Sequence, residues 1–202
     1  MPRLLPTYAL LLVVLTPGSR AAEVEVTPFL GYQAGGTFET RTGDRNIESS
    51  PNFGLVLSIR TRPDGLIEFL YSRQQTRLES LDIFGADQGF DLNVEYLHFG
   101  GLWEIKQGRT KPFLGLSIGG TRFDPRVDGV SDELYFSAGI SGGGKLMFSE
   151  RVGLRIEGRG LATLLGSGGG IFCGFPPGTC GITVTGSTLL QIDALLGLIV
   201  QF

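Results

Sequence analysis

The sequence predicts an all-β protein, an eight-stranded antiparallel up-and-down β-barrel that spans a membrane. Three observations support this prediction. Eight segments alternate apolar with polar residues, the connections between them are alternately short and long, and the chain ends in a segment with one wholly apolar face and a terminal aromatic residue. Because successive side chains of a strand point to opposite faces of a sheet, each segment is expected to form a strand with one apolar face.

The C-terminal segment, residues 189–202, has the clearest alternation. One set of alternate residues is entirely apolar and consists of Leu190, Ile192, Ala194, Leu196, Leu198, Val200 and Phe202. The other set is mixed and includes Gln191, Asp193 and Gln201. A segment of this length is long for a strand of a soluble sheet, but it suits a tilted strand that crosses a bilayer. We therefore expect this strand to lie against lipid.

Seven further segments precede it and bring the expected strands to eight. They cover residues 24–38, 52–61, 66–78, 90–105, 112–123, 135–148 and 152–162. In the first, Phe29 is an apolar exception on the polar face. In the fourth, Leu92, Val94, Tyr96 and Leu102 suggest one phase, whereas Leu97, Phe99 and Trp103 suggest the other. A β-bulge near Gly100 and Gly101 would reconcile the two phases.

The connections between these segments alternate in length. Short ones at residues 62–65, 106–109 and 149–151 alternate with long ones at residues 39–51, 79–89, 124–133 and 165–187. The first short connection reads Arg62-Pro63-Asp64-Gly65, a composition typical of a tight turn. Outer-membrane β-barrels have short periplasmic turns and longer external loops. This pattern places both chain termini at the periplasmic end.

Composition limits the classes of function. The chain has 202 residues and a net charge of −3, so it lacks the basic excess expected of a nucleic-acid-binding protein. Its 32 glycines suit strands that twist sharply and approach one another closely in a small closed barrel.

The N-terminal residues read as a targeting segment. Arg3 precedes a short apolar run at residues 4–15, and Ser19-Arg20-Ala21 supplies small residues for cleavage. We predict a signal peptide at residues 1–21, with cleavage after Ala22 as an alternative, and a barrel domain at residues 22–202.

The polar faces of the segments carry charges of both signs. Six of the expected strands contribute this set, which consists of Glu25, Arg60, Glu68, Lys145, Arg155, Glu157, Arg159 and Asp193. A soluble barrel of the lipocalin type would turn these charges to water and the apolar faces inward. The alternation of loop lengths and the apolar C-terminal face favour the opposite arrangement. Inside a barrel the charges must pair, because an uncompensated buried ion costs several kcal/mol. We expect a charge network that fills the interior, since eight strands leave only enough room for side chains.

The chain end resembles the assembly signal of bacterial outer-membrane β-barrels, in the positions of Leu196, Leu198, Val200 and Phe202. Together with the Arg62–Gly65 turn and the stretch from Val152 to Gly160, it makes residues 22–202 similar to the OmpA-type transmembrane domain and its opacity-like relatives. This resemblance implies a location in the bacterial outer membrane. It also implies two partners, the outer-membrane lipid and the barrel-assembly machinery.

Three residues are candidates for chemistry. Cys173 and Cys180 lie in the last long connection, and in an exported protein such a pair is expected to form a disulfide. His98 is the single histidine, and its surroundings lack the His-x-Ser-Asn pattern of outer-membrane lipid A deacylases. We therefore predict no catalytic residue, no metal site and no cofactor.

The expected role is that of a non-catalytic barrel, with a structural or surface-interaction function carried by an extracellular ligand at the external loops. A narrow channel or transporter for ions or small apolar solutes is the alternative, and a lipid-modifying enzyme is less favoured. Nucleic acid is not an expected partner.

Overall fold

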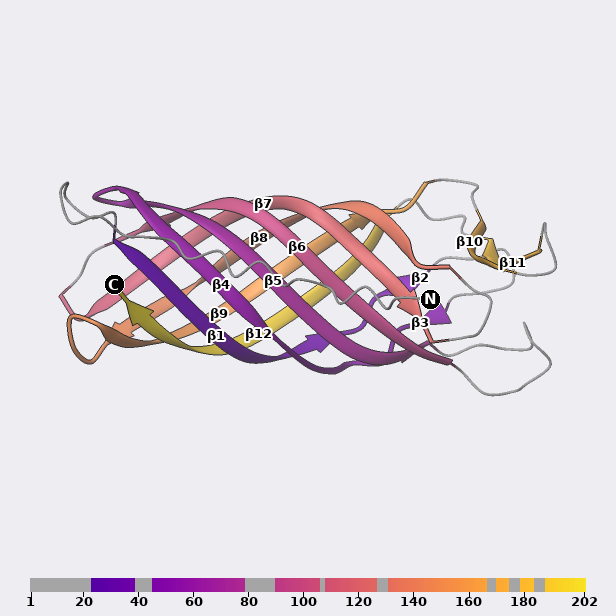
Figure 1. The fold of residues 1–202 in the computed structure, drawn as a ribbon, viewed down its shortest axis with the longest axis horizontal. Helices are drawn as coiled ribbons and strands as arrows, with labels where there is room; N and C mark the ends of the chain where they lie inside the picture. The colour runs from indigo at the N-terminus through magenta and orange to yellow at the C-terminus, as the bar shows by residue number, and fades with distance from the viewer. Residues whose placement is uncertain are drawn as a thin grey trace, which may run out of the picture.

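A computed structural model describes residues 23–38, 45–78, 90–105, 108–126, 131–166, 170–174, 179–183 and 188–202. The predicted signal peptide lies outside these residues. Eight long antiparallel strands form a closed barrel (Figure 1). They are β1 (Val24–Ala34), β4 (Ser50–Arg62), β5 (Gly65–Leu78), β6 (Phe90–Glu104), β7 (Thr110–Pro125), β8 (Glu133–Met147), β9 (Val152–Leu164) and β12 (Thr188–Gln201). Within the described part of the chain, no helix is long and apolar enough to cross a membrane.

The strand order confirms the predicted up-and-down barrel. Each of the eight strands pairs with its neighbour in the chain, and β1 pairs with β12 to close the sheet. The closure is in register from Val26, opposite Val200, to Ala34, opposite Ile192. A closed sheet has no free edge strand, so all ladder hydrogen bonds along the barrel wall are made within the chain.

The two ends of the barrel differ. The links β4–β5, β6–β7 and β8–β9 are short and lie at the same end as Phe202, on the left of Figure 1. We call this the turn end. Gly108 in the β6–β7 link has a φ of 61°, a left-handed conformation that favours glycine. At the opposite end, the hairpin end, lie two small hairpins: β2 (Thr37–Phe38) with β3 (Arg45–Asn46), and β10 (Gly170–Gly174) with β11 (Thr179–Thr183).

The two faces of the wall have opposite character. The predicted apolar sets point outward, as shown by Leu190, which is 67% exposed, and Phe202, which is 74% exposed. Glu25, Lys145 and Arg155 are fully buried inside. Phe29, the apolar exception on the first polar face, is buried in the lumen together with Val56, Leu70 and Leu195. This inside-out distribution is the one that a lipid environment stabilises.

The predicted bulge in the fourth segment is wrong. β6 pairs with β5 and with β7 without a register shift at Gly100 or Gly101. The set of Leu97, Phe99 and Trp103 points outward. In the other set, Leu92, Val94 and Tyr96 join one apolar cluster of the lumen, and Leu102 joins another with Leu66 and Phe113. A register irregularity occurs instead between Arg60 and Arg62, at the β4–β5 turn.

Candidate functional site in the barrel lumen

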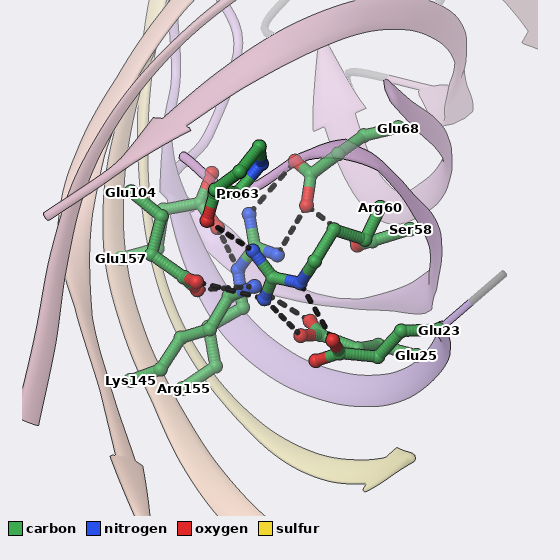
Figure 2. A network of polar contacts seen from close by, with 10 residues as sticks. All are labelled: Glu23, Glu25, Ser58, Arg60, Pro63, Glu68, Glu104, Lys145, Arg155 and Glu157. Atoms are coloured by element: carbon green, nitrogen blue, oxygen red, sulfur yellow. Dashed lines mark hydrogen bonds and ion pairs between the residues drawn. The ribbon is translucent and has the colours of Figure 1, made fainter. Parts of the chain in front are cut away.

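The half of the lumen nearer the turn end is filled by an ion-pair lattice, and Figure 2 shows most of its members. Its outer layer has two cations, Arg60 and Lys145. Arg60 Nη2 donates to Glu104 Oε2 at 2.8 Å, and its Nε donates to Glu23 Oε2 at 2.8 Å. Lys145 Nζ donates to Glu25 Oε2 at 2.5 Å and lies 3.2 Å from Glu104 Oε1. Glu25 and Glu104 are therefore each shared between two cations, since Arg60 is also 3.6 Å from Glu25.

A second layer lies deeper in the lumen. Arg155 donates two hydrogen bonds to Glu68, from Nη1 at 2.6 Å and from Nη2 at 3.0 Å, and a third to Glu157 at 2.5 Å. Ser58 Oγ also donates to Glu68, at 2.6 Å. Arg159 Nε donates to the other oxygen of Glu157, at 2.6 Å. The bidentate Arg155–Glu68 geometry is the strongest form of carboxylate recognition available to an arginine.

Two aromatic rings support the deeper layer. The Arg155 guanidinium lies 4.6 Å from the centroid of the Phe113 ring, and that of Arg159 lies 5.2 Å from the centroid of the Phe29 ring. A cation over an aromatic face is attracted by the ring quadrupole, and the attraction is larger when water is excluded. Phe113 and Phe29 therefore stabilise the buried guanidinium groups of Arg155 and Arg159.

All eight charged residues proposed from the sequence lie in this lattice, although Asp193 is bound less tightly than the others. Arg159 Nη1 is 3.8 Å from Asp193 Oδ2, and the Asp193 oxygens make no hydrogen bond among the described residues. The sequence analysis missed two members, Glu23 and Glu104. Glu104 has the same parity as Leu102 and His98 in β6, so a correct phase for that segment would have found it.

Polar residues occupy the centre of the lumen. His98 Nδ1 is 3.0 Å from Ser117 Oγ, and its Nε2 is 2.8 Å from Ser137 Oγ. Beside His98 lies a cavity of about 30 Å³, also lined by Glu157 and Arg159. Such a volume accommodates about one or two water molecules. Serine hydroxyls occupy both ring nitrogens of His98, and the side chain is 2% exposed.

The half of the lumen nearer the hairpin end contains an apolar cluster beside buried polar residues such as Gln74 and Thr76. Eight buried side chains form one cluster there: Ile47, Leu92, Val94, Tyr96, Phe123, Leu161, Leu165 and Leu189. The hydroxyl of Tyr96 faces the centre and is hydrogen-bonded to Gln191. The polar interior that is usual for membrane β-barrels continues beside this cluster through hydrogen bonds from Gln74 Nε2 to Gln33 O and from Gln191 Nε2 to Gln74 Oε1.

Ile47 reaches the cluster from the connection between β1 and β4. Its backbone N–H donates to Gly36 O at 2.9 Å, and the next N–H, of Glu48, donates to Arg77 O at 3.0 Å. Thr76 Oγ1 donates to Glu48 O at 2.6 Å. These bonds hold residues 47–48 between the chain that follows β1 and the end of β5, as an extension of β4. From this position the buried Ile47 side chain joins the apolar cluster.

The remaining predicted sites lie on the wall and in the last connection. Leu196, Leu198, Val200 and Phe202 lie on the outward face of β12, and the backbone N–H of Phe202 donates to Val24 O at 2.9 Å. Cys173 and Cys180 are opposite each other in the β10–β11 register. Their side chains lie outside the described part of the structure, so the disulfide stays a prediction. Among the described residues, no group of three or more His, Cys, Asp or Glu side chains is placed to hold a metal ion.

The amino-acid sequence matches no protein-family model and no curated protein. The fold is similar to that of solved β-barrels. Neisserial surface protein A aligns with a TM-score of 0.61 at 14% identity, over 89% of this chain and 97% of that chain.

The outer membrane protein OprG from Pseudomonas aeruginosa aligns with a TM-score of 0.57 at 12% identity, over 92% of this chain and 98% of that chain. The outer membrane protein AlkL, solved in DMPC lipid bilayers, aligns with a TM-score of 0.59 at 10% identity, over 100% of this chain and 97% of that chain. The predicted resemblance to small outer-membrane β-barrels is confirmed at the level of the fold. The narrower likeness to the OmpA-type domain stays a prediction.

Proposed function

We propose that this chain, which has the fold of a small outer-membrane β-barrel, is a non-catalytic outer-membrane protein that acts at the cell surface through its long connections. The observation that supports the proposal is the packing of side chains along the lumen. An ion-pair lattice occupies the turn half, and an apolar cluster with hydrogen-bonded glutamines beside it occupies the hairpin half. A barrel filled in this way is a rigid support, and the parts left to vary are the connections at its hairpin end.

The lengths of the connections support an orientation. Short turns face the periplasm and long connections face outward in bacterial barrels of this class. On that basis the turn end, with Phe202 and the start of β1, is periplasmic, and the β2–β3 and β10–β11 hairpins are outside the cell. An extracellular ligand at this end is the proposed partner.

Epitope accessibility on intact cells tests this proposal. One tag is inserted at residues 175–178, between β10 and β11, and a second at residues 149–151, between β8 and β9. We expect an antibody to label only the first tag until the outer membrane is permeabilised. Labelling of the second tag alone would show the reverse orientation and would remove the hairpin end as a surface for external ligands.

Planar-bilayer recording tests the seal separately. The purified barrel is expected to show no stepwise conductance, because paired side chains block the lumen at two levels. An Arg60→Ser, Arg155→Ser double variant, which shortens one side chain in each lattice layer, is the positive comparison. Regular conductance steps from the unaltered barrel would contradict the sealed state and favour the channel alternative.

Transport of small apolar solutes is a second candidate function, because an apolar cluster lies in the hairpin half of the lumen. A solute entering beside Ile47 would have to separate the packed side chains of Leu92, Phe123 and Leu161. Uptake of a radiolabelled alkane or small aromatic compound by cells that express the barrel measures this. An Ile47→Ala variant with faster uptake would support transport, and equal uptake with and without the barrel would exclude it.

We propose no catalytic role for His98. A serine nucleophile activated by histidine usually needs a third group that orients the base, as well as access for the substrate. His98 has serine partners at both ring nitrogens and is enclosed by the wall. A His98→Gln variant is expected to leave the lipid composition of the membrane unchanged, which mass spectrometry of extracted lipids would verify.

A further inference from the structure

The outer wall carries a charged interruption of its apolar surface on β5, β6 and β7. Arg73 is directly opposite Glu95 in the β5–β6 register, and Glu95 is directly opposite Arg122 in the β6–β7 register. We call these three residues the charged row. The same line of outward side chains continues to Phe53 on β4 and Leu134 on β8. Phe53 is 47% exposed and Leu134 is 75% exposed, so apolar surface flanks the row on both sides.

The side chains of the row contact one another. Arg73 Nη1 lies 3.7 Å from Glu95 Oε1, and Arg122 Nη1 lies 3.3 Å from Glu95 Oε2. The Tyr71 hydroxyl donates to Glu95 at 3.2 Å. Glu95 thereby holds two guanidinium groups on adjacent sides of itself. Arg122 Nε also donates to Asp132 Oδ2 at 2.9 Å. Both arginines still present surface outward, since the side chain of Arg73 is 28% exposed and that of Arg122 is 47% exposed.

The outward residues next to the charged row indicate where the row lies along the strands. Two residues nearer the turn end on each strand, the outward residues that lie opposite one another are Leu55, Tyr71, Leu97, Gly120 and Phe136. This line carries no charge, and a tyrosine lies within it, as is usual where the hydrocarbon region meets the headgroups. The charged row lies on the hairpin side of this uncharged line, near the ends of β5 at Leu78, of β6 at Phe90 and of β7 at Pro125. We place the lipid headgroups of the hairpin side there.

We propose that Arg73 and Arg122 bind a phosphorylated headgroup of a membrane lipid in the leaflet that surrounds the hairpin end. A guanidinium matches a phosphate through parallel N–H donors and is more weakly hydrated than an ammonium, which suits a site at the edge of hydrocarbon. Glu95 acts as a positioning residue that spaces the two cations, and Phe53 and Leu134 contact the acyl chains. The assignment of the leaflet rests on the orientation proposed above, whereas the proposed contact with a lipid headgroup does not.

A solvated ion-pair chain is the simpler interpretation of these residues, and it predicts something different. Exposed pairs of this kind contribute little energy and have no preference for a particular lipid. A headgroup site predicts a preference for lipids with phosphate groups and dependence on both arginines. It also predicts that Glu95 competes with the phosphate for the same guanidinium groups.

Native mass spectrometry of the detergent-solubilised barrel, titrated with lipid A or with its dephosphorylated form, tests the proposal. We expect the phosphorylated lipid to bind and the dephosphorylated form to bind about ten-fold more weakly. An Arg73→Gln, Arg122→Gln double variant should lose this preference. Arg151→Gln, which removes an exposed arginine at the turn end, is the matched control and should keep it.

A Glu95→Gln variant tests whether weaker lipid binding by the double variant comes from loss of the fold. It removes the competing carboxylate, so binding of the phosphorylated lipid should become tighter, which a misfolded barrel does not reproduce. Equal binding of both lipid forms, or a double variant that binds like the unaltered chain, would overturn the proposal. Displacement of the lipid by millimolar inorganic phosphate would also overturn it, since the site would then recognise a free anion. The epitope experiment reports on orientation alone, so the two failures remain distinguishable.

Discussion

The two halves of the lumen differ in their main contacts, an ion-pair lattice in one and an apolar cluster in the other, inside one continuous wall. In the turn half, Arg60, Lys145 and Arg155 meet their carboxylates at hydrogen-bond distance. In the hairpin half, leucine, valine and aromatic side chains pack without ionic contacts to one another. The comparison shows that strand pairing alone does not determine the interior of a small barrel. Each half must satisfy its own condition, charge balance in one and volume in the other.

The two conditions fail in different ways. Removing one member of an ion-pair lattice leaves its partners buried without a compensating charge. Every residue that paired with the removed side chain is therefore destabilised. Removing a methyl group from an apolar cluster leaves a cavity whose cost depends on local packing alone. Variants in the two halves should therefore differ in how second substitutions rescue them.

The largest effect is expected for Arg155→Met. This change leaves Glu68 without its bidentate partner and takes one of two cations from Glu157. We expect a loss of about 3–5 kcal/mol in the free energy of unfolding, as for other broken buried ion pairs. Urea titration of the barrel in lipid vesicles measures it.

Rescue identifies the cause of that loss. Adding Glu68→Gln to Arg155→Met removes the stranded charge and should restore more than half of the stability. A double variant no more stable than Arg155→Met would mean that packing around Phe113, rather than charge balance, holds this half together.

In the hairpin half, Leu161→Ala is the corresponding test. Leu161 is buried among the apolar residues of the cluster, and its truncation should cost about 2–5 kcal/mol through lost burial and the cavity left behind. The matched control is Leu190→Ala, on the outward face, where lipid replaces the missing atoms. A loss at Leu190 as large as that at Leu161 would show that the cluster is no tighter than the contact with lipid.

A smaller and more local effect is expected at neighbouring glycines of β8. A Cβ on Gly143 would lie 2.1 Å from Ile156 O and 2.9 Å from an atom of the Phe113 ring, whereas a Cβ on Gly144 meets nothing within 4 Å. Gly143→Ala should therefore cost about 1–3 kcal/mol, because the added methyl group meets the β9 backbone at Ile156 and the edge of the Phe113 ring. Gly144→Ala should be neutral. Equal unfolding midpoints for the two variants would contradict the close approach of Gly143 to β9 and to Phe113.

Most of the fold was predictable from the sequence, because a membrane barrel repeats one simple pattern. Every strand must turn an apolar face to lipid, and the chain must return by alternate short and long links. Charges such as Arg155 and Glu157 follow from the same rule, since they have no place on the lipid face. The pattern does not say what lies across the lumen from a given side chain.

For that reason the apolar cluster and two lattice members escaped prediction. Leu92, Val94 and Tyr96 lie on the same face of β6 as Glu104. Alternation of apolar and polar residues does not predict a lumen face that has apolar residues in one part and a charged residue in another. Ile47 enters the lumen from a connection that has no alternation at all. The spatial partners of these residues come from β7, β9 and β12, far along the chain. Only closure of the barrel brings them together.

An exposed ion pair outside the lumen provides the smallest expected effect and a contrast to the buried lattice. Arg122 Nε donates to Asp132 Oδ2 at 2.9 Å, and this hydrogen bond lowers the pKa of the Asp132 carboxyl below its usual value. A lowered pKa in the folded state means that the pair stabilises the fold above the unfolded pKa of about 3.9, and that this contribution is lost as the pH falls through the lower, folded value.

The test compares unfolding midpoints of the unaltered chain and of Asp132→Asn across that range. The unaltered chain should be slightly more stable near neutral pH, and the difference should disappear as the pH falls below about 3.9. Because both proteins keep the buried lattice, its own titration cancels in the comparison. A difference that persisted below the folded pKa of Asp132 would have to come from the shape of the asparagine side chain, and the exposed pair would then contribute nothing through its charge.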